Sequence, residues 1–222
     1  EALQGGLIVS CQALEEEPLH SSFIMSRMAR AAMEGGAQGI RANSTGDIAA
    51  IKKEVSLPVI GLIKRDYPDS PVYITPTAQE VEQLSQSGAD IIALDFTRRI
   101  RPGGIPSDQF FKDIRRRYPN CLFMADCASL DDALLAEQLG FDFAGTTLCG
   151  YTAQTRGTPL PAFGLMREMA RQLSIPVIAE GGIWTPEQLR QALNTGVFAA
   201  VVGTAITRPR EITQRFVKAL QL

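Results

Sequence analysis

The sequence SGADIIALD at residues 87–95 contains the pattern that decides the fold. A glycine turn leads into a continuously apolar run at 91–94, and the run ends on Asp95. Continuous apolar runs are typical of strands in a parallel sheet that is covered on both faces, whereas half-exposed strands alternate. Seven other segments show a similar short run, so we expect strands at 6–11, 39–42, 59–64, 91–95, 122–126, 143–146, 177–180 and 199–203.

The eight runs are regularly spaced along the chain. Their starts lie 20 to 34 residues apart, which leaves room for a helix and two loops in each interval. The even-numbered runs start at 39, 91, 143 and 199, and each follows a glycine turn suited to a helix C-terminus. This repeat predicts an α/β fold, a (β/α)8 TIM barrel forming a single catalytic domain over residues 1–222. An open doubly wound sheet is the structural alternative.

The composition of the chain argues against several classes of binding partner. Lys and Arg total 22 against 24 acidic residues, a formal charge of −2, which disfavours nucleic acid as a partner. No apolar run approaches the ~18 residues of a membrane span, so we expect no membrane association. The four cysteines form no C-x-x-C pair, which favours reduced thiols and a cytoplasmic location.

The chain has one histidine, His20, in a polar stretch expected to form a loop. A histidine-based triad or a two-histidine metal site would depend on this residue, so we expect neither. The chemistry is therefore expected to rest on Lys, Asp, Glu, Arg, Tyr or Cys.

In a TIM barrel, polar residues at the carboxyl ends of the strands are candidates for function because those ends meet at one mouth. Three arginines after the fourth run, Arg98, Arg99 and Arg101, are expected in a solvated loop. The candidates at the strand ends are Ser10, Gln12, Arg41, Lys64, Asp95, Asp126, Thr146, Thr147 and Glu180.

Lys64 closes an apolar run, and desolvation there can lower its pKa enough for it to act as a base near neutral pH. Glu180 is a candidate catalytic carboxylate or an ion-pair partner that fixes Lys64, and Asp126 could orient a substrate hydroxyl or join a proton relay. Arg41 could bind an oxygen of the ligand or form an ion pair with a carboxylate at the rim.

Glycines follow the last two runs, at Gly181-Gly182 and at Gly203, and Arg208 lies just beyond. Loops after the seventh and eighth strands form the phosphate site of many barrels, where backbone N–H groups approach the phosphate oxygens. Gly182, Gly203 and Arg208 are therefore predicted to bind phosphate.

Six motifs in order along the chain resemble the N-acetylmannosamine-6-phosphate 2-epimerase family of the ribulose-phosphate-binding barrel superfamily. They are GLIVSCQ at 6–12, GLIKRD at 61–66, MAD at 124–126, GTT at 145–147 with GYT at 150–152, IAEG at 178–181 and VGTAITR at 202–208.

The resemblance implies interconversion of N-acetyl-D-mannosamine 6-phosphate and N-acetyl-D-glucosamine 6-phosphate in bacterial sialic-acid catabolism, without metal or nucleotide. It places the catalytic lysine on Lys64 and its carboxylate partner on Glu180. It assigns sugar contacts to Gln12, Arg41 and Asp126, phosphate contacts to Gly182, Gly203 and Arg208, and it suggests a homodimer.

The sequence is also consistent with two other functions. A lysine with carboxylates at a barrel mouth also suits a Schiff-base aldolase, and a phosphosugar-binding barrel need not be catalytic.

Overall fold

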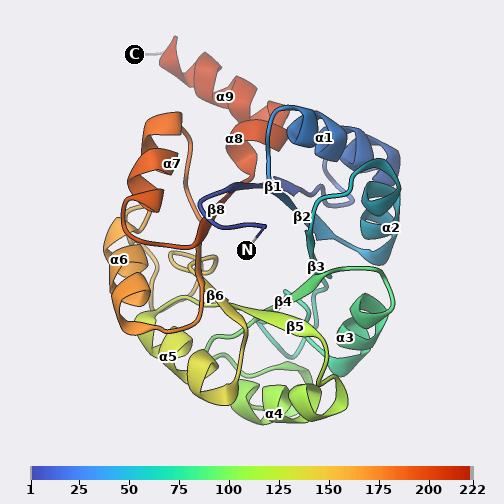
Figure 1. Ribbon diagram of the computed structural model, residues 1–222, viewed down its shortest axis with the longest axis vertical. Coiled ribbons are helices and arrows are strands. Elements are labelled where there is room, and N and C mark those ends of the chain that lie inside the picture. The colour runs from blue at the N-terminus through green and yellow to red at the C-terminus, as the bar shows by residue number, and fades with distance from the viewer. Residues whose placement is uncertain (1, 221–222) are drawn as a thin grey trace.

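The computed structural model describes residues 2–220. Within that span, eight parallel strands close into a barrel in chain order (Figure 1). Pairing of the first strand with the last, with Leu7 opposite Ala200, closes the sheet and excludes the open alternative. Every predicted strand is confirmed to within two residues. The strands are β1 (Leu7–Cys11), β2 (Gly39–Asn43), β3 (Val59–Leu62), β4 (Ile91–Asp95), β5 (Leu122–Asp126), β6 (Phe143–Gly145), β7 (Val177–Ala179) and β8 (Ala199–Val202).

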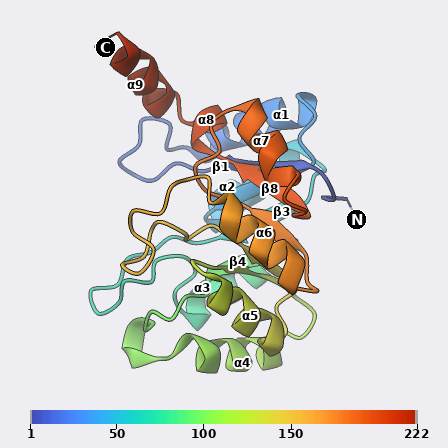
Figure 2. The same ribbon diagram turned by 90° about the vertical axis from the view of Figure 1, so that its left-hand side faces the viewer.

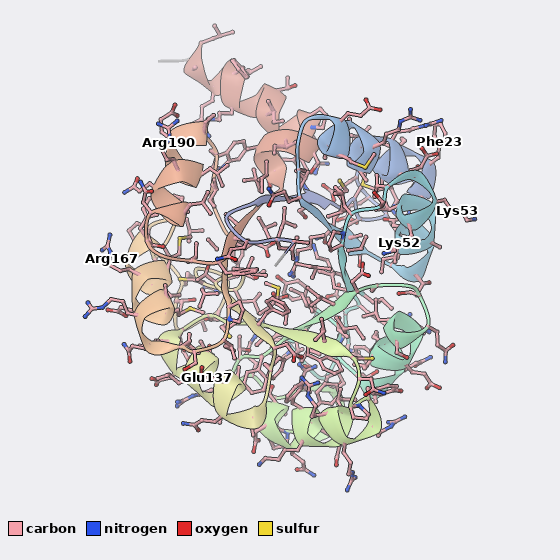
Figure 3. All side chains as sticks on the ribbon, in the orientation of Figure 1. Phe23, Lys52, Lys53, Glu137, Arg167 and Arg190 are labelled. Atoms are coloured by element: carbon pink, nitrogen blue, oxygen red, sulfur yellow. The ribbon has the colours of Figure 1, made fainter. Side chains whose placement is uncertain are left out.

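Helices surround the barrel (Figure 1). Charged side chains on their outer faces, among them Lys53, Arg167 and Arg190, point away from the strands (Figure 3). No helix of residues 2–220 is long and apolar enough to cross a lipid bilayer. The helices are α1 (Ser22–Glu34), α2 (Thr45–Glu54), α3 (Ala78–Ser85), the 3-10 turn η1 (Pro102–Gly104), α4 (Ser107–Arg117), α5 (Leu130–Leu139), α6 (Phe163–Gln172), α7 (Pro186–Leu193), α8 (Thr204–Thr207) and α9 (Pro209–Ala219).

Alternation along each strand divides the core into two clusters and sets the direction of the functional side chains. On β3, Ile60 and Leu62 belong to the cluster that fills the barrel, whereas Val59 belongs to the cluster between barrel and helices. Successive side chains on a strand point to opposite faces, so Lys64 has the inward parity of Ile60 and Leu62. The same parity places Arg41 on β2 inside the barrel.

The loops after β1, β3 and β6 project from the same side of the barrel, opposite the N-terminus (Figure 2). The loop after β3 folds back on its own strand, because Lys64 forms an isolated antiparallel bridge with Ile74. The amide of Thr75 donates to the carbonyl of Ile63 at 2.7 Å, and the amide of Arg65 donates to the carbonyl of Tyr73 at 3.0 Å. The backbone around Lys64 is therefore held on two sides.

The expectation that Arg101 lies in a solvated loop is wrong. Its side chain is buried over the ring of Phe110, with 4.0 Å from the guanidinium carbon to the ring centroid. It donates to the carbonyls of Thr75 at 3.0 Å and Pro76 at 2.9 Å, and also to that of Asp95. Backbone carbonyls of a loop that folds inward replace water around this cation, so Arg101 anchors the base of the β3–α3 loop.

Candidate active site

A cavity of about 900 Å³ opens at the carboxyl end of the barrel. Its volume lies within the range of small-molecule sites. Most of the predicted site residues line it: Gln12, Arg41, Lys64, Glu180, Gly182, Gly203 and Arg208. Asp126 is not among the lining residues of the cavity, and it is completely buried.

Lys64 lies on the wall of this cavity, and its amide donates to the Asn43 side-chain oxygen at 2.8 Å. Burial, assisted by the positive charges of Arg208 and Arg41, lowers the pKa of Lys64 to about 8. Glu180 opposes that shift. About one tenth of Lys64 is then neutral at pH 7, far more than for an ordinary lysine, and the neutral form is the one that a general base requires.

Arg41 joins two carboxyl groups at the bottom of the site. Its Nη2 lies 2.5 Å from Asp126 Oδ2, and its Nη1 lies 3.4 Å from Glu180 Oε2. Burial opposes the charge on Arg41, but the two carboxyl groups outweigh it, so the pKa of Arg41 is above its ordinary value. Of the two roles predicted for Arg41, the structure therefore shows the ion pair with carboxyl groups.

Glu180 pairs with Arg41, and no ion pair within 4.0 Å joins it to Lys64 in the part of the chain that the structure describes. Burial raises the pKa of Glu180, and the nearby Asp126 charge adds to this effect while Arg41 opposes it. The Thr147 hydroxyl contacts both carboxyl groups, at 2.8 Å from Asp126 Oδ1 and 3.0 Å from Glu180 Oε2.

Gln12 contributes an unsatisfied acceptor to the cavity wall. Its Nε2 donates to the Ser10 hydroxyl at 2.9 Å, whereas its buried Oε1 has no hydrogen-bond partner among residues 2–220. A buried oxygen without a partner is unfavourable, so a donor on a ligand would relieve it. The position suits the sugar contact that was predicted for Gln12.

The glycines after β7 and β8 line the cavity beside Arg208. Gly182 has a φ of 71°, and an added Cβ there would lie 2.5 Å from the Cβ of Leu160, so a side chain would be strained. Arg208 is held by Glu17, with 3.0 Å between Nη2 and Oε2. The structure brings these three predicted phosphate contacts together on one side of the site.

Residues outside the predicted catalytic set also shape the cavity. Asn43 accepts a hydrogen bond from the Lys64 amide. It lies two residues after Arg41 on β2, so its side chain points to the same inner face of the barrel. Tyr73 lines the cavity from the folded-back loop, and burial raises the pKa of its phenol to about 12. No sequence signal identified Tyr73, because its direction depends on how the loop folds.

Asp95, another predicted candidate, has a structural role, and His20, from which no chemistry was expected, lies at the edge of the cavity. Asp95 accepts from the amide and hydroxyl of Thr97 at 3.1 and 2.8 Å, which closes the turn after β4. His20 is exposed at the rim, with its Nδ1 3.0 Å from the Ala13 carbonyl oxygen. Within residues 2–220, no three His, Cys, Asp or Glu side chains are grouped so as to hold a metal ion.

The closed barrel with a polar cavity at the carboxyl ends of its strands places this protein among the (β/α)8 barrels that carry enzyme-type sites. A family model described as "Putative N-acetylmannosamine-6-phosphate epimerase" matches residues 25–222. The chain therefore belongs to the N-acetylmannosamine-6-phosphate epimerase family, which confirms the resemblance predicted from its motifs.

Relatives that carry the same family description align with this chain over nearly its whole length. Relatives from Enterobacter sp. (strain 638) and Caldanaerobacter subterraneus subsp. tengcongensis, both named "Putative N-acetylmannosamine-6-phosphate 2-epimerase", are 56% and 54% identical to this chain. The alignments cover 100% and 98% of this chain and 95% and 92% of the relatives. The solved structure of the N-acetylmannosamine-6-phosphate 2-epimerase from Clostridium perfringens is 49% identical, with a TM-score of 0.94 over 98% of this chain and 94% of that one. A thiamine phosphate pyrophosphorylase from Pyrococcus furiosus, 21% identical with a TM-score of 0.64, shares the fold.

Proposed function

We propose that the chain acts as a single catalytic domain that inverts C2 of an N-acylaminosugar 6-phosphate, converting N-acetyl-D-mannosamine 6-phosphate to N-acetyl-D-glucosamine 6-phosphate. The observation that carries this proposal is a lysine with a pKa lowered to about 8 on the wall of a cavity that also presents Arg41 and Glu180. Membership of the epimerase family supplies the substrate class.

The reaction needs a base next to the open-chain form of the sugar. The C1 aldehyde makes the C2 proton removable, and the electron pair of the C2–H bond then passes toward the carbonyl oxygen as an enolate. Lys64 takes the proton as a neutral amine, and its ammonium form, with Arg41, stabilises the developing oxyanion. The ammonium group of Lys64, whose hydrogens exchange with solvent, then returns a proton to the opposite face of C2, which gives the epimer and regenerates the neutral amine.

The remaining residues position the substrate. Gln12 offers its free Oε1 to a donor on the sugar, and Arg41 offers its guanidinium to a sugar oxygen. Asp126 lies beneath the cavity wall, so its proposed contribution passes through Arg41 and Thr147, both of which it contacts. Glu180 is the proposed carboxyl partner of Lys64, acting across the cavity.

The phosphate is proposed to bind at Gly182, Gly203 and Arg208. The two glycines allow a close approach of the backbone, and Arg208 can offer a planar pair of donors to phosphate oxygens. Binding at this remote group fixes the sugar over Lys64, so binding energy is used to orient the reacting carbon. No metal, cofactor or nucleic acid has a part in this mechanism.

Conversion of the substrate tests the proposal directly. Purified enzyme is incubated with N-acetyl-D-mannosamine 6-phosphate, and the anomeric proton signals of both epimers are followed by NMR. We expect an equilibrium mixture to be reached from either epimer. Saturable binding without any conversion would instead support a non-catalytic phosphosugar-binding barrel.

Schiff-base aldolase chemistry is the second candidate, because a desolvated lysine is also a nucleophile. Borohydride is added during turnover, and the intact mass of the protein is measured. Proton transfer predicts no adduct. A reduced covalent adduct on Lys64 would overturn the epimerase mechanism in favour of the aldolase.

The chain is proposed to form a homodimer through α9. This helix projects from the barrel in both views (Figures 1 and 2), and none of its residues is buried. Phe216 and Val217 on it are 73% and 48% exposed, and clustered apolar side chains on a surface mark an interface. Light scattering should show a dimer that Phe216→Ser dissociates and the control Gln214→Ser leaves intact; a monomeric native protein would contradict this.

The proposed location is the cytoplasm. All four cysteines are free thiols, in keeping with a reducing compartment.

A further inference from the structure

The Thr147 hydroxyl lies between two carboxyl groups, and this contact limits how many protons the site holds. Its Oγ1 is 2.8 Å from Asp126 Oδ1 and 3.0 Å from Glu180 Oε2. A hydroxyl has one hydrogen to donate, and an ionised carboxylate has none. If both carboxyl groups were ionised, one of these two short contacts would lack a hydrogen between its oxygens.

The Thr147 hydrogen is best assigned to Asp126. Asp126 is completely buried, and Arg41 Nη2 lies 2.5 Å from its Oδ2, which stabilises the ionised form. A buried carboxylate needs a donor at its other oxygen as well, and Thr147 is the nearer partner there. Thr147 can then only accept at its contact with Glu180.

The charges around Glu180 agree with this assignment. Glu180 faces Arg41 from β2, Lys64 from the end of β3 and Asp126 from β5. Arg41 is shared, and its contact with Glu180 is 3.4 Å against 2.5 Å with Asp126. Two ionised carboxylates would thus share the single charge of the buried Arg41 guanidinium, and their mutual repulsion is relieved when one of them binds a proton.

We propose that Glu180 is a protonated carboxylic acid in the resting enzyme, that its O–H donates to Thr147, and that Thr147 is the positioning residue that maintains this state. The proton remains on Glu180, and the hydrogen-bond chain runs from Glu180 through Thr147 to the Asp126 carboxylate. Burial, which raises the pKa of Glu180, acts in the same direction.

The consequence for chemistry rests on the proposed function. An ionised Glu180 would raise the pKa of Lys64 and would repel an enolate oxygen. A neutral Glu180 does neither, and its proton can stabilise the developing oxyanion by a hydrogen bond. The site then holds a base, Lys64, and an acid, Glu180, at the same pH, the division of roles expected when two titratable groups have opposed environments.

The state of Glu180 is measured on the ligand-free enzyme. The protein is labelled with ¹³C at the glutamate carboxyl carbons, and the Glu180 signal is assigned by its loss in Glu180→Gln. We expect its titration midpoint to lie so far above the ordinary glutamate value of about 4.3 that the carboxyl group still carries its proton at neutral pH. A Glu180 carboxyl group that is already ionised at neutral pH would overturn the proposal without any variant of Thr147.

Two variants test the role of Thr147. Thr147→Val keeps the shape and removes the acceptor, so the Glu180 midpoint should fall by about one pH unit, the size expected for one lost hydrogen bond. Thr147→Ser keeps the hydroxyl and should retain the native midpoint. If Thr147 instead donated to an ionised Glu180, Thr147→Val would raise the midpoint, and that result would refute the assignment.

A kinetic measurement separates this role from simple support of the fold. In Thr147→Val, ionised Glu180 raises the pKa of Lys64, so the rise of kcat/KM with pH should move upward by about one unit. Loss of activity with an unchanged pH profile would indicate a structural role and contradict the proposal. Native enzyme that does not form the epimer would refute the proposed function and leave the titration result standing.

Discussion

Replacement of Lys64 by methionine should make the protein more stable at neutral pH while it abolishes activity. The pKa of Lys64 is lowered from 10.5 to about 8, with burial as the main cause. Each unit corresponds to 1.36 kcal/mol, so the charged form costs about 3 kcal/mol of folding free energy before solvent screening. Since Lys64 is only partly buried, we expect Lys64→Met to raise the free energy of unfolding by about 2 kcal/mol at pH 7.

The stability gain of Lys64→Met should also depend on pH, which a change in packing alone would not produce. The folded protein releases the Lys64 proton near pH 8, whereas the unfolded chain keeps it until about 10.5. The cost is therefore fully present below about pH 8 and declines as the pH rises toward 10.5. The stability gain of Lys64→Met should be smaller at pH 9 than at pH 7 by about 1 kcal/mol.

Urea denaturation at pH 7 and pH 9 measures both quantities. Lys53→Met is the matched control, because Lys53 is exposed on α2 and points away from the barrel (Figure 3). Its stability should change by less than about 0.5 kcal/mol at either pH. A Lys64→Met protein no more stable than the native one at pH 7, or a gain that grows with pH, would refute a desolvated lysine.

Three other perturbations test the site. The kcat/KM of the native enzyme should rise about tenfold between pH 7 and pH 9 as Lys64, with a pKa of about 8, becomes neutral; a flat profile would contradict its role as base. Arg101→Met should speed hydrogen exchange at the amides of Arg65 and Thr75 and lower kcat about tenfold, because it removes the anchor of the loop that holds Lys64; native exchange rates would contradict this. Arg208→Met should raise KM about tenfold or more for a phosphorylated sugar and leave the KM of the unphosphorylated sugar unchanged; an equal effect on both would remove the residue from the phosphate site.

Much of the barrel could be predicted because each buried strand is recognisable from a short, local stretch of sequence. An apolar run such as 91–94 shows that a strand is covered on both faces, and the glycine turn before it marks the end of a helix. Alternation within β3 also sets the direction of Lys64, since Leu62 and Lys64 have the same parity. The convergence of Arg41, Lys64 and Glu180 on one cavity follows from these local rules once the barrel closes.

The depth at which each side chain lies in the site could not be predicted from these local patterns. Asp126 and Glu180 both follow apolar runs, yet Glu180 lines the cavity and Asp126 is sealed beneath it. The difference depends on strand register and on the side chains above, which lie far apart in the sequence. Arg101 was mistaken for a solvated residue for the same reason, because its partners are carbonyls of a loop that must first fold inward.

If Lys64 moves the C2 proton, exchange of that proton with solvent must depend on Lys64. N-acetyl-D-mannosamine 6-phosphate is incubated in D₂O with native enzyme or with Lys64→Met, and the C2 proton signal is followed by NMR. The mechanism predicts that native enzyme produces the epimer with deuterium at C2, and that folded Lys64→Met produces neither epimer nor exchange. Epimer formation by Lys64→Met at the native rate, or epimer formed by native enzyme with its original C2 proton fully retained, would contradict it.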